Sequence, residues 1–227
     1  MVAESFVKLP PLESGDRLTR AEFERRYSAM PHIKKAELIE GVVYLASPLR
    51  ARAHGKPHGA IMTWLGVYGA ATPGVEFYDN PTVRLDIDNE PQPDAVLRLE
   101  RGGQSSISAD DYIEGAPELV VEVAASSASY DLHDKLQVYR RNGVREYIVW
   151  RTYSQQLDWF VLKDETYQSL VVDSGGIFRS QRFPGLWLAR DFLLAGNLAE
   201  VLNGLQRGLA TLEHRVFVQQ MDAAVES

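Results

Sequence analysis

A carboxylate in the middle of an apolar stretch is the first feature of this sequence that could do chemistry. Residues 119–124, Leu-Val-Val-Glu-Val-Ala, are apolar enough to form a strand covered on both faces of a sheet, yet Glu122 carries a charge. Burying an unpaired carboxylate is costly, so we expect Glu122 to be paired, protonated or bound to a metal ion. A structural salt bridge is the alternative to a chemical role.

Asp131 and Lys135 lie four residues apart on the helix predicted after this strand. At that spacing they project together along the edge of the helix's apolar face, which includes Tyr139. Because only a short Ser/Ala turn joins the strand to the helix, Lys135 is a candidate neighbour of Glu122. An ordinary surface ion pair, worth roughly 0.2–0.5 kcal/mol, is the alternative for Asp131 and Lys135.

Two further carboxylates stand where a turn meets a predicted strand. Asp94 follows Pro93 and opens an apolar run, and Glu40 precedes Gly41 in a predicted hairpin. Either residue taken alone is typical of a turn or a strand start. Asp94 and Glu40 can belong to a functional site only if the fold brings them close to Glu122.

Hydrophobic periodicity predicts the elements that must position these residues. The predicted elements are an irregular arm at 1–18, a helix at 19–30 capped by Thr19, a hairpin at 35–47, a helix at 57–70, strands at 82–88 and 94–99, the strand, helix and strand of 117–150, strands near 155–162 and 166–172, and a long helical pattern at 190–220. We therefore expect one α/β domain at 19–189, with a helical C-terminal extension at 190–227.

Composition restricts the class of protein. The chain has 227 residues, of which 45% are hydrophobic and 24% charged, and this is enough for one sizeable core. It has no cysteine, which excludes disulfides, thiolate metal sites and a cysteine nucleophile. No apolar run is long enough for a membrane span and no signal-peptide pattern opens the chain, so we expect a cytoplasmic protein without membrane partners.

The net charge of −7 argues against a generally basic nucleic-acid binder, so binding a polyanion would require a local basic patch. Cationic or titratable side chains occupy every second position of one stretch, namely Arg50, Arg52, His54, Lys56 and His58. In an extended loop they would share one side and could contact phosphates. A solvated loop is the alternative.

The "PQPD" of residues 91–94, the apolar strand after it, and residues 117–150 together resemble the Uma-two-like family of putative restriction endonucleases, a bacterial branch of the PD-(D/E)xK nuclease superfamily. The resemblance extends from about Thr19 to about Leu188. Its most specific part is the helix that carries Asp131, Lys135 and Tyr139 and leads into the Gly-Val-x-Glu-Tyr of residues 143–147.

The resemblance implies a restriction-endonuclease-like α/β core, in which a mixed β-sheet is flanked by helices and acidic residues gather at one edge. Asp94 and Glu122 match the acidic pair, and Glu40 matches an acidic position of the "ELI-acid-G" hairpin. Ala124 occupies the usual place of the superfamily's lysine, and Lys135 matches the lysine on the next helix. His58 best matches a histidine of the family, and His54 is the competing alignment.

These residue types suit metal-assisted hydrolysis. Mg²⁺, or Mn²⁺ as a substitute, prefers oxygen ligands, which Asp94, Glu122 and the Val123 carbonyl supply. Lys135 would orient a water or stabilise the transition state, with Asp131 and Tyr139 in support. We therefore predict a metal-dependent endonuclease acting on nucleic acid, with DNA favoured over RNA as the substrate. A nuclease-derived binding module without useful turnover and a hydrolase of other phosphodiesters are the alternatives.

Apolar residues of the C-terminal region recur at alternating intervals of four and three, the spacing of a coiled-coil seam. The series is Leu198, Leu202, Leu205, Leu209, Leu212 and Val216. On a single helix from 197 to 218 this stripe would serve a homodimer, in which Gly204 and Gly208 allow close helix approach. Packing of the stripe on its own domain is the alternative.

Overall fold

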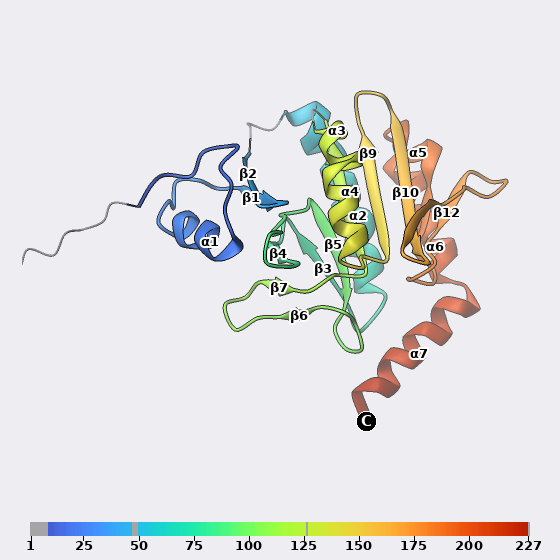
Figure 1. The fold of residues 1–227 in the computed structure, drawn as a ribbon. Coiled ribbons are helices and arrows are strands. Elements are labelled where there is room, and N and C mark those ends of the chain that lie inside the picture. The colour runs from blue at the N-terminus through green and yellow to red at the C-terminus, as the bar shows by residue number, and fades with distance from the viewer. Residues whose placement is uncertain (1–8, 47–49, 126, 227) are drawn as a thin grey trace, which may run out of the picture.

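A six-stranded mixed sheet forms the centre of the protein (Figure 1). The computed structural model describes residues 9–46, 50–125 and 127–226, so part of the predicted N-terminal arm and of the predicted hairpin lies outside the described residues. The strand order is β11-β10-β9-β8-β5-β3, and only β8 and β9 run parallel. The strands are β3 Val75–Asp79, β5 Ala95–Leu99, β8 Leu119–Ala124, β9 Glu146–Arg151, β10 Gln156–Lys163 and β11 Thr166–Ser169.

Helices cover both faces of this sheet, because its strands alternate apolar side chains between the two faces. On β8, Val121 and Val123 pack toward α2 (Lys56–Ala70), whereas Val120 and Ala124 pack toward the opposite face. That opposite face is covered by α3 (Ala128–Leu132) and α4 (Asp134–Arg141), which connect β8 to β9. Glu122 therefore points toward α4.

The helix predicted between β8 and β9 is interrupted. His133 has φ −118° and ψ −76°, which separates α3 from α4. Lys135, two residues after this break, lies inside the protein with 3% of its surface exposed. The predicted position of Lys135 at the edge of the packing face is therefore wrong.

The N-terminal region forms a smaller layer, which contains the predicted helix and hairpin. Helix α1 (Arg20–Ser28) is capped by Thr19, whose Oγ1 accepts a hydrogen bond from the Glu22 amide at 3.5 Å. It packs on β1 (Ala36–Ile39), which pairs with β2 (Val42–Leu45) across the turn at residues 40–41. Because Glu40 and Gly41 have φ of 52° and 69°, this turn is left-handed at both residues.

Short strands complete the fold. The strand predicted at 82–88 contains only β4 (Val83–Arg84), which joins β7 (Ile113–Glu114) and β6 (Ser106–Ile107) in a small sheet. The segment β12 (Ile177–Arg179) pairs with β13 (Trp187–Ala189) before the C-terminal helices.

The C-terminal region is three helices rather than the one predicted. They are α5 (Arg190–Leu194), α6 (Leu198–Leu209) and α7 (Leu212–Glu226). Gly196, at φ 72°, ends the first, and Thr211 separates the other two by accepting a hydrogen bond from the His214 amide. The predicted continuous seam from 197 to 218 is therefore wrong.

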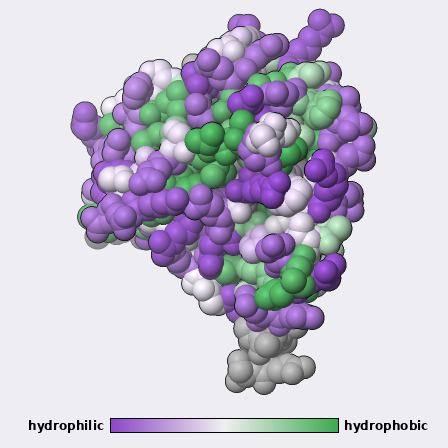
Figure 2. Space-filling model, turned by 90° about the vertical axis from the view of Figure 1, so that its right-hand side faces the viewer, coloured by the Kyte–Doolittle hydropathy of each residue, from purple (hydrophilic) through white to green (hydrophobic). Residues whose placement is uncertain are grey.

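Helix α6 packs its stripe on its own domain, which was the alternative to a dimer seam. Leu205 is fully buried, and the other leucines of α6 pack against the main core. A Cβ at Gly208 would collide with the Gly185 backbone, so this glycine allows close approach within the chain. Leu212 and Val216 on α7 stay exposed, by 63% and 41%. Figure 2 views the molecule from the side of these helices and shows hydrophobic patches on a mostly hydrophilic surface.

Across the described ranges, no helix is both long and apolar enough to cross a membrane.

Candidate active site

The register of two neighbouring strands brings Asp94 and Glu122 together. Ala95 of β5 pairs with Val121 of β8 in an antiparallel ladder, so one further step places Asp94 opposite Glu122. Asp94 Oδ2 accepts a hydrogen bond from the Val123 amide at 2.7 Å, which fixes the carboxylate beside β8. Both acids are almost fully buried, with 4% of their surfaces exposed. The sheet itself therefore builds the acidic pair.

Helix α4 supplies two partners for Glu122. Glu122 Oε1 accepts hydrogen bonds from Lys135 Nζ at 2.8 Å and from the Tyr139 hydroxyl at 2.9 Å. The two residues are four apart, so they lie on the same face of the helix. The interpretation of Glu122 as a residue with a specific partner is confirmed.

Lys135 is shared among three carboxylates. Its Nζ also donates to Glu37 Oε1 at 2.8 Å and lies 3.8 Å from Asp131 Oδ1. Glu37 comes from β1, so the hairpin closes the site over α4. Ser127 donates to Asp131 Oδ2 at 2.6 Å, and this contact holds Asp131 beside the lysine.

Asp94 has cationic neighbours of its own. His54 Nε2 lies 3.3 Å and Lys35 Nζ 3.7 Å from Asp94 Oδ1. His58 instead lies 3.3 Å from the Asp94 carbonyl oxygen and 3.1 Å from Asp79 Oδ1. The structure thus places His54, rather than His58, on the Asp94 carboxylate.

Burial and charge shift the pKa values in this cluster. Burial raises the pKa of Glu122 to about 8. The charge of Lys135 opposes this shift, and the charges of Asp131, Asp94 and Glu37 add to it. Burial would also raise the pKa of Glu37, but Lys135, Lys35 and the hydrogen bonds from Lys135 and the Gln92 amide hold it below its usual value.

Lys135 stays charged in this environment. Burial alone would lower the pKa of Lys135, but the carboxylates of Glu122, Glu37 and Asp131 raise it well above its usual value. Burial lowers the pKa of His54, more than the adjacent Asp94 raises it, which favours a neutral imidazole. Lys135 is therefore a hydrogen-bond donor and a fixed positive charge rather than a proton acceptor.

The acidic cluster opens into a pocket of about 500 Å³, which we call the acidic pocket. Its lining includes the four carboxylates, Lys35, Arg50, His54, Tyr130, Lys135 and Tyr153. Two lining residues carry buried polar atoms without a hydrogen-bond partner among the described residues, the Tyr130 hydroxyl and His54 Nδ1. These atoms leave room for polar contacts to water or to a ligand.

The donor set fits a hard divalent cation held mainly by solvent and substrate. Within the described ranges, no group of three or more His, Cys, Asp or Glu residues is arranged to hold a metal ion. Mg²⁺ often takes only one or two carboxylates, with water and phosphate oxygens completing its shell. Asp94 and Glu122 meet that requirement. Burial, and after it the neighbouring carboxylates, raises the pKa of Glu122, and a bound cation would favour its charged form.

The structure keeps Glu40 away from the acidic pocket. Glu40 lies in the hairpin turn, and its side chain is 48% exposed and paired with Arg141 at 2.8 Å. Glu37, three residues earlier, occupies the place expected of Glu40. A charged residue inside an apolar strand is the signal that could have identified Glu37, as it identified Glu122. Lys35 was missed as well, although alternation places it on the same strand face as Glu37.

The basic stretch is not extended. Residues 51–55 form a π-helical turn that continues into α2, so alternate residues do not share one side. Arg50 and His54 line the acidic pocket, whereas Arg52 and Lys56 line a neighbouring pocket. The prediction of a single basic strip is therefore wrong, although its residues lie around the candidate site.

Comparison with known families identifies the family of the chain. The family described as "Putative restriction endonuclease" (Uma2) matches residues 20–191. The chain belongs to this family. The Uma2 resemblance drawn from residues 91–94 and 117–150 is thereby confirmed.

A solved structure supports the fold of this Uma2 protein. The structure of a putative nuclease belonging to DUF820 from Anabaena variabilis ATCC 29413 is similar, with a TM-score of 0.61 and 11% sequence identity. The similarity covers 76% of this chain and 97% of that chain. The predicted α/β restriction-endonuclease-like fold is confirmed. No curated protein matches the chain.

Proposed function

We propose that this Uma2 protein is a metal-dependent endonuclease that hydrolyses phosphodiester bonds in DNA. The observation that carries the proposal is the pairing of Asp94 with Glu122 across two strands, with Lys135 at 2.8 Å from Glu122. Two carboxylates and one ammonium facing a pocket suit phosphodiester hydrolysis, in which a metal ion and a fixed cation stabilise developing charge.

Asp94, Glu122 and the Val123 carbonyl are the groups that would hold Mg²⁺ or Mn²⁺. When bound, such an ion polarises the phosphodiester and lowers the pKa of a coordinated water. Lys135, kept protonated by its three carboxylate neighbours, orients Glu122 and presents positive charge to the phosphate. His54 and Lys35 orient Asp94, and Tyr139 fixes the other acid. Arg50 stands at the pocket to bind a phosphate.

A cleavage assay with matched variants tests this proposal. Supercoiled plasmid, single-stranded DNA and RNA are incubated with Mg²⁺, Mn²⁺ or EDTA. We expect metal-dependent cleavage of DNA by the wild type, and a loss of about 100-fold or more in Asp94→Ala and Glu122→Gln. Glu213→Gln, which changes an exposed carboxylate of α7, is the matched control and should cleave like the wild type.

Calorimetric titration with Mn²⁺ measures metal binding independently of cleavage. The wild type should bind the ion, and Glu122→Gln should not. Nucleic-acid binding without cleavage under every metal would favour the catalytically inactive binding module. Equal Mn²⁺ binding by the wild type and Glu122→Gln would remove Glu122 from the metal site.

A further inference from the structure

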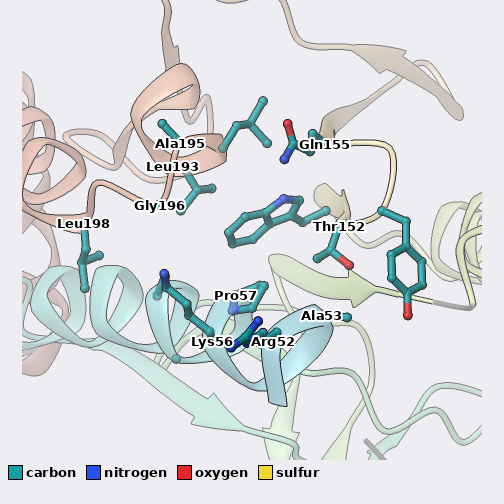
Figure 3. A pocket seen from close by; sticks show the side chains of 15 residues that line it. Arg52, Ala53, Lys56, Pro57, Thr152, Gln155, Leu193, Ala195, Gly196 and Leu198 are labelled. Carbon is teal, nitrogen blue, oxygen red and sulfur yellow. The ribbon is translucent and has the colours of Figure 1, made fainter. Parts of the chain in front are cut away.

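A second pocket lies beside the acidic pocket and differs from it in character. It has a volume of about 590 Å³ and lies between the start of α2, the turn after β9, and α5 with the start of α6 (Figure 3). Figure 3 shows Arg52 and Lys56 on one side, with Leu193 and Ala195 on the other. We call it the side pocket. Its size is in the range of small-molecule sites.

The walls of the side pocket are apolar and partly aromatic. Trp150 at the end of β9, Pro57 of α2, and Leu193 and Leu198 of the C-terminal helices contribute to the lining. Thr152 and Gln155 add polar side chains on the side of the β9–β10 turn (Figure 3). A flat aromatic group with polar edges matches such a surface.

The charges of the side pocket are positive only. None of its lining residues is acidic, although the whole chain has a net charge of −7. Arg52 and Lys56 are exposed and have no hydrogen bond or ion pair with any residue in the described ranges. Two unpaired cations beside an apolar pocket favour a ligand with an anionic group next to an aromatic one.

Tyr153 connects the two pockets, because it lines both. Tyr153 is 60% exposed, and its hydroxyl accepts a hydrogen bond from Arg50 Nη1 at 3.2 Å. The two pockets therefore adjoin at Tyr153, as a strand that occupies both of them would require. Exposed aromatic rings next to cations are typical of surfaces on which bases stack.

From these observations we propose that the side pocket binds one unpaired nucleobase of the substrate strand, with its phosphate on Arg52 and Lys56. The nucleotide is the neighbour of the one whose phosphate occupies the acidic pocket. This inference rests on the proposed nuclease function and adds to it a requirement for a base outside a duplex stack, as in a single strand or a locally opened site.

Photocross-linking locates the base without requiring turnover. The probe is a fluorescent thymidine single strand of about 12 nucleotides that carries 5-iodouracil at one position at a time, with Ca²⁺ in place of Mg²⁺. We expect one position to cross-link to Trp150 or Tyr153, as mapped by mass spectrometry. An abasic nucleotide at that position should raise the Kd of the wild type about tenfold.

Variants of the pocket give the second readout. Ala195→Trp fills the side pocket, and it should remove the cross-link and the sensitivity to the abasic nucleotide. Arg52→Met/Lys56→Met should weaken binding about tenfold and reduce the salt slope by about 1.4, since each lost contact to a single strand removes about 0.7. Lys34→Met/Lys163→Met removes the same charge from exposed positions elsewhere and should change neither. Because Arg52 and Lys56 are exposed, their replacement leaves the core intact.

Cross-links that map outside the side pocket, or an equal response of the two double variants, would overturn the proposal. A free thymidine monophosphate that competes as well as the strand would also overturn it in favour of a small-nucleotide site. The cleavage assay stays independent of these results. If the wild type cross-links in the side pocket but cleaves no nucleic acid, only the proposed nuclease function is contradicted. If it cleaves but cross-links elsewhere, only the proposed base binding in the side pocket is contradicted.

Discussion

At the scale of single residues, Lys135 holds the site together. Its Nζ contacts Glu122 and Glu37 at 2.8 Å each and Asp131 at 3.8 Å, and its side chain is 3% exposed. The sequence predicted that Lys135 lies at the edge of a helix face, a position at which Lys135→Met would largely spare stability. Its burial changes that expectation, since removing it leaves carboxylates unpaired in the interior.

Lys135→Met should therefore lower both activity and stability. At pH 8 the free energy of unfolding should fall by about 3–5 kcal/mol, because buried carboxylates lose their partner. The loss should be smaller at pH 5, where Glu122, with a pKa raised to about 8, is already protonated. Urea unfolding at both pH values measures the effect, with the exposed Lys163→Met as control. An equal loss at pH 5 and pH 8 would contradict this account.

At the scale of elements, the hairpin decides which glutamate enters the site. Glu37 lies in β1 and points to Lys135, whereas Glu40 lies in the turn and pairs with Arg141. Strand residues alternate between faces, and the turn at residues 40–41 carries the chain away from the pocket. Position in the hairpin, rather than the type of residue, separates the two acids.

Matched substitutions in the hairpin test this assignment. Glu37→Gln should reduce cleavage by on the order of 10- to 100-fold, because it removes one of the charges that position Lys135. Glu40→Gln should stay within about twofold of the wild type, since its partner Arg141 lies at the surface. The kcat of both variants on one DNA substrate is the measurement. A larger loss in Glu40→Gln than in Glu37→Gln would restore Glu40 to the site.

A second carboxylate outside the active site links α1 to the segment before β5. Burial, and after it the neighbouring Glu24, raises the pKa of Glu90 from 4.5 to about 8. Glu90 Oε2 has no hydrogen-bond partner among the described residues and lies 3.8 Å from Arg84 Nε. The folded protein therefore keeps a proton on Glu90 that the unfolded chain releases above about pH 4.5.

This proton makes stability depend on pH in a defined direction. The contribution of Glu90 is fully present below pH 4.5 and is lost as the pH rises through about 8. Glu90→Gln keeps a neutral side chain, so it should lose less stability than the wild type between pH 5 and pH 9. The difference should be on the order of a few kcal/mol in urea unfolding. Parallel pH profiles of the wild type and Glu90→Gln would contradict the prediction, and Glu213→Gln is the control.

At the scale of the whole molecule, the C-terminal helices belong to the same core as the sheet. Leu193, Val201, Leu205 and Phe217 pack in one cluster with α2 and the central strands. The leucine stripe of α6 is therefore occupied within the chain. A homodimer stays a prediction, and its contact would have to use surfaces other than the buried face of α6.

Glutamate substitutions separate packing from assembly. Leu205→Glu should destabilise the protein by about 3 kcal/mol or more, because it places a charge in the core. Leu212→Glu, at a position that is 63% exposed, should change stability by less than about 0.5 kcal/mol. Thermal unfolding measures both, and sedimentation of the wild type at micromolar concentration tests the dimer. A folded Leu205→Glu variant that converts a dimer to a monomer would restore the seam.

The sequence by itself determined the local elements and showed that Glu122 is an unusual residue within one of them. The apolar run of β8, the capped helix α1, the hairpin with Glu40-Gly41 at its turn, and helix α2 all follow from periodicity and from turn residues, which act over a few positions. Glu122 stood out for the same reason, since a charge inside a buried strand needs a partner wherever that partner lies.

Only the tertiary structure decided which residues become partners. The antiparallel register of β5 and β8 sets Asp94 opposite Glu122, and the packing of α4, which begins after the break at His133, buries Lys135. The fold also places Glu37, rather than Glu40, beside Lys135, and His54, rather than His58, beside the Asp94 carboxylate. Sequence periodicity defines the face of an element, but the same apolar stripe serves a core or an interface equally well. What covers a face depends on contacts between segments far apart in the chain, and these form only in the folded protein.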